Sequence, residues 1–194
     1  MRLLRNSIHG VLVLAGIVVA LAPKAVFADQ DHAVPITGTF TMATVTPSAV
    51  NYCLSASTPV EFAGGTPIEF RGIGNISKLG PLFLTVNKCA AVVGGVLTYT
   101  GIFTMTAGNG DTLGGTYAGA RIGSANPNGF AQHQGAFTVT EGTGRFSDVR
   151  GVLSWTAVTS ARSVGVTAPP PALPTVNQQA FYMVQGTMLS REKD

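Results

Sequence analysis

Charged side chains are scarce in this chain, since Asp, Glu, Lys and Arg together make up 11% of its 194 residues. Aromatic residues contribute 8%, and only two cysteines and three histidines occur. Without a cluster of Lys or Arg, the chain lacks the basic patch that binds nucleic acids or anionic membranes. It also lacks the Cys and His spacings of zinc sites, a G-x-S-x-G nucleophile turn and a phosphate-binding loop. The sequence therefore predicts no nucleic-acid partner, cofactor or metal, and identifies no catalytic residue.

The N-terminus carries the one long apolar run. Arg2 and Arg5 precede an unbroken apolar stretch at residues 11–21, and small residues allow cleavage after Ala28. As a helix the stretch would cover only about 17 Å, short of the roughly 30 Å hydrocarbon core of a membrane. We therefore expect residues 1–28 to be a signal peptide, the protein to be secreted or periplasmic, and stable membrane insertion to be absent.

Removing this segment changes the charge of the chain. It holds three of the twelve basic residues and none of the nine acidic ones, so residues 29–194 have a net formal charge of zero. Their length suits one domain with a full hydrophobic core.

Short β-strands dominate the rest of the chain. Gly, Thr, Val and Ala are abundant, no amphipathic helix is evident, and short apolar runs recur between glycine-rich breaks. The runs are residues 36–44, 50–54, 68–76, 82–86, 96–105, 112–118, 135–140, 151–159 and 179–189. This spacing indicates an all-β, antiparallel barrel or sandwich.

Residues 135–157 show the strand pattern most clearly. Phe137 and Val139 alternate with threonines, which is the period-two pattern of a strand with one buried face. Gly142 and Gly144 allow a tight reversal, and Trp155 lies on the apolar face of the following strand. Gly151 within that strand predicts a bulge or a close approach of two backbones.

The string GTGRFSDVRG in this stretch resembles the glycine-turn signature of the allene oxide cyclase and dirigent barrels. The matching positions are Gly142, Thr143, Gly144, Phe146, Arg150 and Gly151. Two further strings, at 72–80 and 109–113, are similar to bacterial secreted members of that superfamily. The resemblance implies an eight-stranded closed antiparallel barrel, often trimeric, with a central cavity. The resemblance therefore predicts the fold but identifies no catalytic residue, because the matching strings are structural turns.

Loops and termini complete the single domain predicted over residues 29–194. Asn109-Gly110 predicts a hairpin tip with Asp111 as a turn residue. Residues 119–134 are predicted to be a long loop, with His133 as a solvated loop histidine, and His32 to lie in an unanchored N-terminal tail. The proline-rich residues 168–174 suit an extended connector, and residues 190–194 a solvated tail.

The last strand is apolar on both of its faces. Tyr182 and Val184 share one face, and Phe181 and Met183 share the other. Burial on both sides would fit a subunit interface, so we predict a homo-oligomer, which the resemblance suggests is a trimer.

The two cysteines, Cys53 and Cys89, are expected to form a disulfide in an oxidising compartment. The alternative is a reactive thiol. Glu61, Glu69 and Glu141 are the carboxylates that could face a cavity. Glu69 either points outward and solvated beside Arg71 or is an interior acid, and the cost of burying an unpaired carboxylate favours the outward position.

Three functions remain open. The first is binding of a small apolar molecule inside the barrel, because a closed barrel can enclose one ligand. The second is a cyclase or isomerase, which would need an ionisable group in a polar interior cluster. The third is a structural or surface interaction protein, which would have a filled barrel and an exposed apolar patch.

Overall fold

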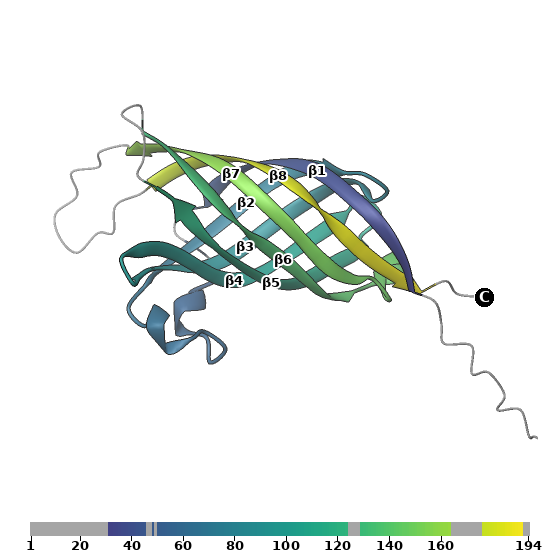
Figure 1. Cartoon of the computed structure of the whole chain (residues 1–194), viewed down its shortest axis with the longest axis horizontal. Coiled ribbons are helices and arrows are strands. Elements are labelled where there is room, and N and C mark those ends of the chain that lie inside the picture. Colours follow the sequence, from purple (N-terminus) through teal and green to yellow (C-terminus); the bar gives the residue numbers. More distant parts are fainter. Residues whose placement is uncertain (1–30, 46–47, 49, 124–128, 164–175, 192–194) are drawn as a thin grey trace, which may run out of the picture.

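The protein is a single closed β-barrel. The computed structural model describes residues 31–45, 48, 50–123, 129–163 and 176–191. Eight antiparallel strands follow one another around the barrel in sequence order, and β8 closes it against β1 (Figure 1). The strands are β1 Asp31–Val45, β2 Thr66–Ile76, β3 Gly80–Val93, β4 Val96–Ala107, β5 Thr112–Ile122, β6 Phe130–Gly142, β7 Arg150–Ser163 and β8 Val176–Arg191. The predicted all-β, eight-stranded barrel is confirmed.

Two predictions lie outside the described residues. These are the signal peptide at 1–28 and the connector at 168–174. Within the part of the chain that is described, no helix has the length and apolar character needed to cross a membrane.

Packed aromatic rings occupy the middle of the barrel. The rings of Phe103, Tyr117, Phe137, Trp155 and Tyr182 are all buried, and their closest centroids lie 4.9–6.4 Å apart. Trp155 stacks on Tyr117 at 5.0 Å. Gly119 and Gly135 make room for the indole, because a Cβ at either position would lie 2.4 Å from its ring. Period-two alternation thus directs the apolar face of each strand inward.

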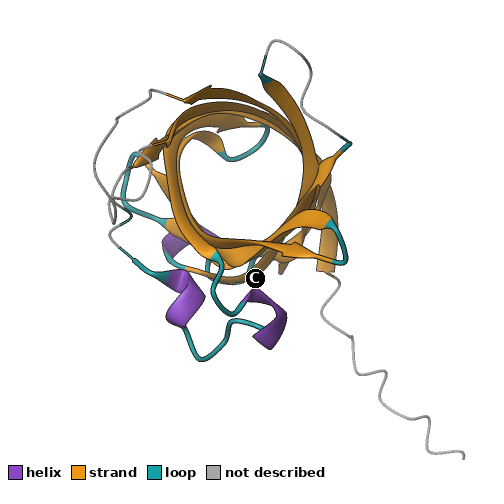
Figure 2. Ribbon diagram, turned by 90° about the vertical axis from the view of Figure 1, so that its left-hand side faces the viewer, coloured by secondary structure: helices purple, strands orange, loops and turns teal. Residues whose placement is uncertain are grey.

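The two ends of the barrel are built differently. At the end that we call the cavity end, β1, β3, β5 and β7 finish; at the other, the turn end, β2, β4 and β6 finish. The connection between β1 and β2 contains two 3-10 helices, η1 Tyr52–Leu54 and η2 Val60–Phe62. Figure 2 shows the closed ring of strands with these helices outside it. The predicted run at 50–54 is therefore not a strand.

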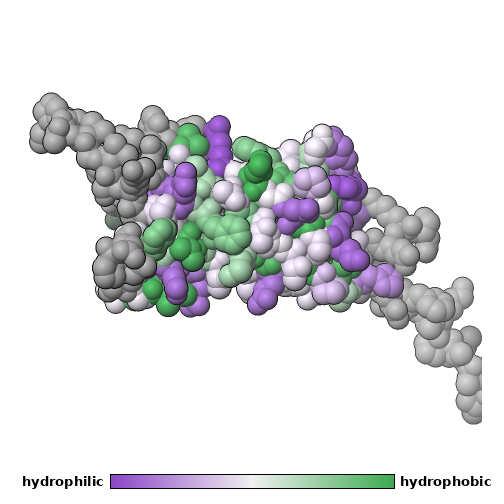
Figure 3. All heavy atoms as spheres, turned by 90° about the horizontal axis from the view of Figure 1, so that it is seen from above, coloured by the Kyte–Doolittle hydropathy of each residue, from purple (hydrophilic) through white to green (hydrophobic). Residues whose placement is uncertain are grey.

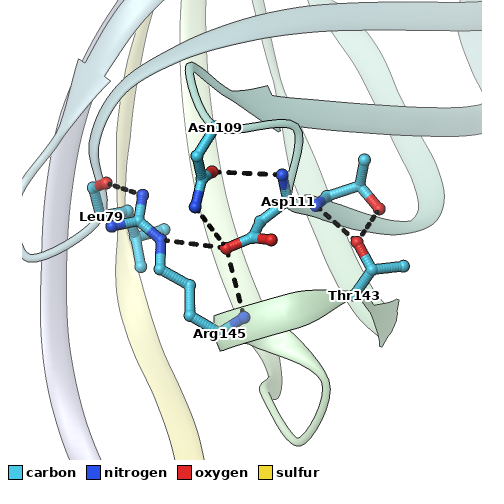
Figure 4. Close-up of polar contacts among 6 residues, drawn as sticks. Leu79, Asn109, Asp111, Thr143 and Arg145 are labelled. Carbon is cyan, nitrogen blue, oxygen red and sulfur yellow. Dashed lines mark hydrogen bonds and ion pairs between the residues drawn. The ribbon is translucent and has the colours of Figure 1, made fainter.

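Three neighbouring turns are tied together at the turn end (Figure 4). The Asp111 carboxylate accepts hydrogen bonds from the Asn109 side chain at 2.8 Å and from the Arg145 backbone N–H at 3.2 Å. Arg145 Nε lies 3.7 Å from the same carboxylate, and its Nη2 donates to the Leu79 carbonyl at 2.9 Å. Asp111 is a turn residue, as predicted, and it also links the β4–β5 turn to the β6–β7 turn.

The glycine-turn string joins β6 to β7. It forms a third 3-10 helix, η3 Gly144–Phe146, whose Phe146 is buried in the core. Gly144 has a φ of +54°, and a Cβ there would meet the Asp111 carboxylate, so this turn requires glycine. Arg150 Nη1 donates to the Val149 carbonyl at 2.7 Å. The glycine-turn string thus closes the turn end of the barrel.

Gly151 marks the predicted close approach of two backbones. A Cβ at this position would lie 2.4 Å from the Thr187 carbonyl oxygen of β8. The irregularity in the sheet lies elsewhere, between Gly114 and Gly115 of β5, where the register against β6 shifts.

Three segments that were predicted to be irregular contain strand residues in the described part of the chain. In the segment 119–134, β5 continues to Ile122 and β6 begins at Phe130, so the loop prediction was wrong for most of it. Neither His32 nor Ser190 lies in a free tail, because the two pair across β1 and β8. Long-range pairing of these residues decides their conformation, and their local composition does not reveal it.

The outer face of β8 is exposed in the single chain. Phe181 and Met183 are 47% and 56% accessible, while Tyr182 and Val184 are buried inside the barrel. Apolar side chains also appear as green groups among polar ones on the face drawn in Figure 3. The strand is therefore buried on one side only, and the homo-oligomer remains a prediction.

Candidate functional site

A cavity of about 540 Å³ opens at the cavity end of the barrel. Seven strands and the β1–β2 connection line it. Its apolar wall includes Ile68, Ala90, Leu97 and Ala131, and its polar groups come from Lys88, Tyr99, Arg121, His133, Thr159 and Gln178. The size lies within the range of about 300–1,000 Å³ that is usual for small-molecule sites. An apolar wall with a few polar groups is also typical of such sites.

Lys88 lies in this cavity on the inner face of β3. It follows Leu84 and Val86 in the inward alternation of the strand and is only 5% exposed. Its Nζ lies 4.1 Å from the ring centroid of Tyr99, 4.6 Å from that of Phe70 and 5.4 Å from that of Tyr117. The amine thus lies against the side of the aromatic core that faces the cavity end.

Gly101 on β4 makes room for the stem of Lys88. The two residues are direct register partners, and a Cβ on Gly101 would lie 2.7 Å from Lys88 Cα and 2.2 Å from the Asn87 carbonyl oxygen. Any other residue at position 101 would displace β3 at the lysine.

His133 connects two hydroxyl groups of the cavity. Its Nδ1 lies 3.0 Å from the Tyr99 hydroxyl, and its Nε2 lies 2.8 Å from the Thr159 hydroxyl. The three residues come from β4, β6 and β7. In a neutral imidazole one ring nitrogen donates and the other accepts, so Tyr99 and Thr159 take opposite roles. A protonated imidazole would donate from both nitrogens, and both hydroxyls would then accept.

Burial shifts the pKa values of Lys88, His133 and Tyr99 so that their neutral forms are favoured. Desolvation lowers the pKa of Lys88 to about 7. Desolvation, followed by the charges of Lys88 and Arg121, lowers the pKa of His133 to about 4. For Tyr99, desolvation is also the main cause and raises the pKa to about 12. At neutral pH the cavity thus contains a neutral imidazole, a neutral phenol and an amine that readily loses its proton.

Arg121 adds a hydrogen-bond donor to the same cavity. It is the register partner of His133 on β5 and is partly buried. Its Nε is buried and has no hydrogen-bond partner among the residues described. A buried donor without a partner carries a free-energy cost that a bound acceptor would relieve.

The predicted disulfide supports the wall of the cavity from outside. Cys53 and Cys89 are bonded, across a sequence separation of 36. Cys89 faces outward on β3, where Tyr52 and Phe62 pack around it. Because Lys88 is the preceding residue, the disulfide anchors the β1–β2 connection beside the lysine. The reactive-thiol alternative was wrong.

The carboxylates predicted as cavity candidates lie apart from one another. Glu61 is exposed at the rim, and Glu141 is exposed at the turn end. Glu69 points to the outer side of β2 and pairs with Arg71, as predicted, but it is only 1% exposed and hence not solvated. The interior-acid alternative was wrong.

His133 is the predicted residue whose setting changes most. It is a buried strand residue inside the cavity, so the solvated-loop prediction was wrong. Lys88, Tyr99, Arg121 and Thr159 were missed. One signal could have found Lys88, namely its position in the apolar register of Leu82, Leu84, Val86 and Ala90. The glycine-turn residues lie at the opposite end of the barrel from the cavity.

No metal centre is evident in the described part of the chain, where no three His, Cys, Asp or Glu side chains gather. Comparison with protein-family models, with curated proteins and with solved structures found no match to the chain. The resemblance to the allene oxide cyclase and dirigent barrels therefore stays a prediction.

Proposed function

We propose that the barrel binds a small, largely apolar molecule in the cavity, with a polar group of that molecule turned toward Lys88, Arg121 and His133. The observation that carries the proposal is the cavity itself, in which an apolar wall surrounds polar groups that converge on one place. Such a surface suits a ligand with an apolar body and one polar end.

The aromatic core limits how deep the ligand enters. Because Tyr117, Phe137, Trp155 and Tyr182 fill the middle of the barrel, the ligand occupies its mouth rather than a central channel. This revises the expected position of the ligand, which was the barrel interior. The disulfide agrees with the predicted secreted or periplasmic location.

The test fills the cavity by substitution. Ala131→Phe introduces a ring into the wall, whereas Ala118→Phe places the same ring on the outer face of β5, where Ala118 is exposed. Native mass spectrometry with octanol, octanoate and octanal then measures adducts of the full-length mature protein. We expect binding of at least one probe, a loss of roughly tenfold or more in affinity for Ala131→Phe, and no change for Ala118→Phe. Equal binding by both variants, or none by the unsubstituted protein, would contradict the proposal.

A further inference from the structure

We propose that Lys88 condenses with an aldehyde or ketone group of the bound molecule to form an imine. The inference rests on the proposed function, because it names the chemistry of the polar end of the ligand. It makes Lys88 a covalent binding residue.

In the described part of the chain, a charged Lys88 would be stabilised by aromatic faces alone, which attract a cation, and not by water or a carboxylate. Its Nζ faces the rings of Phe70, Tyr99 and Tyr117, and it makes no ion pair with a carboxylate in the part of the chain that the structure covers. Glu69, on the neighbouring strand, points outward and pairs with Arg71. Arg121, which also lines the cavity, carries a positive charge that repels a protonated Lys88. A structural lysine would be expected to reach water or a carboxylate.

Burial also makes the amine nucleophilic at neutral pH. Desolvation lowers the pKa of Lys88 to about 7, so a large fraction of the amine is unprotonated there. A desolvated lysine in an apolar pocket is one of the established forms of activated amine. Because Lys88 lines the cavity, a ligand held there can reach it.

The reaction needs no oxidant or reductant. The lone pair of Nζ attacks the carbonyl carbon, the C=O π electrons move to oxygen, and a proton from nitrogen passes to that oxygen to give a carbinolamine. The nitrogen lone pair then expels the hydroxyl group, which leaves as water after taking up a proton, and loss of the second N–H proton gives the neutral imine. One carbonyl compound and one amine thus give one imine and one water.

The His133 chain can move these protons. Its neutral imidazole joins the hydroxyls of Tyr99 and Thr159 at 3.0 and 2.8 Å, within the cavity that contains Lys88. A neutral imidazole can accept a proton at one nitrogen while it releases one at the other. We assign His133 as a positioning and proton-transfer residue for the condensation.

Reductive trapping tests the proposal. The mature protein is incubated near pH 7.5 with octanal and sodium cyanoborohydride, and labelled lysines are identified by peptide mass spectrometry. We expect Lys88 to be alkylated on the order of tenfold to a hundredfold faster than Lys78, which is exposed to solvent. Lys88→Met should remove the fast labelling, and Lys78→Met should leave it unchanged. Thermal unfolding of both variants checks that they are folded.

The other probes separate the two proposals. Failure of octanol, octanoate and octanal to bind overturns the proposed function. Binding of octanol or octanal without fast labelling of Lys88 overturns the imine alone. Tight binding of octanoate, with Lys88 and Lys78 labelled at equal rates by octanal, would instead make Lys88 a partner for an anion and would likewise overturn the imine.

Discussion

The cavity end and the turn end of the barrel differ in what occupies them. At the turn end, Leu79, Phe146 and Val149 are buried from two short connections, and Asp111 and Arg145 tie these to the β4–β5 turn. At the cavity end, the β1–β2 connection is held outside the barrel by a disulfide, and the interior is left open around Lys88 and His133. One end thus adds to the stability of the core, while the other retains buried polar groups at a free-energy cost. This division is typical of proteins that bind ligands on a rigid scaffold.

Phe146→Ala should have the largest effect on stability. Phe146 is 3% exposed and fills the turn end, so its truncation should lower the free energy of unfolding by about 3–5 kcal/mol. Denaturant unfolding measures the change. The matched control is Phe83→Ala on the outer face, 42% exposed, for which we expect a clearly smaller loss. Equal losses in the two variants would show that the turn end is not part of the core.

Removal of the disulfide tests the cavity end. Cys53→Ser with Cys89→Ser should lower the free energy of unfolding by roughly 2–4 kcal/mol, because the unfolded chain gains the entropy of a loop of about 37 residues. Amide hydrogen exchange should rise in residues 50–65 and stay low at the turn end. A reductant should destabilise the unsubstituted protein by a similar amount and leave the double variant unaffected. Uniformly faster exchange would contradict a local role.

Lys88→Met should change how stability depends on pH. The pKa of Lys88 is 10.5 in the unfolded chain and about 7 in the folded one. Between these values the unfolded chain binds more protons, so the free energy of unfolding should rise with pH by up to about 1.4 kcal/mol per pH unit. The variant should lose this rise.

Other groups of the cavity titrate outside the range that we would measure, pH 7 to 9. The pKa of His133 is lowered to about 4, whereas those of Tyr99 and Tyr182 are raised to about 12. The tyrosines should act in the opposite direction, and only near or above their unfolded pKa of 10.0. Denaturant unfolding at several pH values measures how the free energy of unfolding changes with pH. Identical slopes for the variant and the unsubstituted protein would refute the inference that Lys88 is buried and neutral in this range.

Asp111→Asn should have the smallest effect. The Arg145 side chain of this pair is 51% exposed, so loss of the charge should cost less than about 1 kcal/mol, and high salt should reduce the difference further. Thermal unfolding at low and high salt measures both. A loss above about 2 kcal/mol would show that the Asp111 contacts form a cooperative network that holds the three turns.

Local pattern was sufficient for much of the fold. The alternation of Phe137 and Val139 with threonines correctly placed the inward face of β6, and two cysteines in a chain predicted to be exported correctly predicted the disulfide. The same alternation, continued back from Phe137, would have placed His133 inward, but residues 119–134 were predicted to be a loop. Glycine was ambiguous there because it serves a turn at position 123, with a φ of +66°, and the packing of Trp155 at position 119.

The candidate site depended on contacts that no local pattern contains. By itself the sequence determined which side chains share a face of each strand, because that follows from the period of two along the backbone. Only the tertiary structure decided that Lys88, Tyr99, His133 and Thr159 meet in one cavity, since they come from four strands. Their meeting depends on the register of each strand pair and on closure of β8 against β1. Register is set by packing and pairing summed over the whole barrel, so a window of sequence does not reveal it.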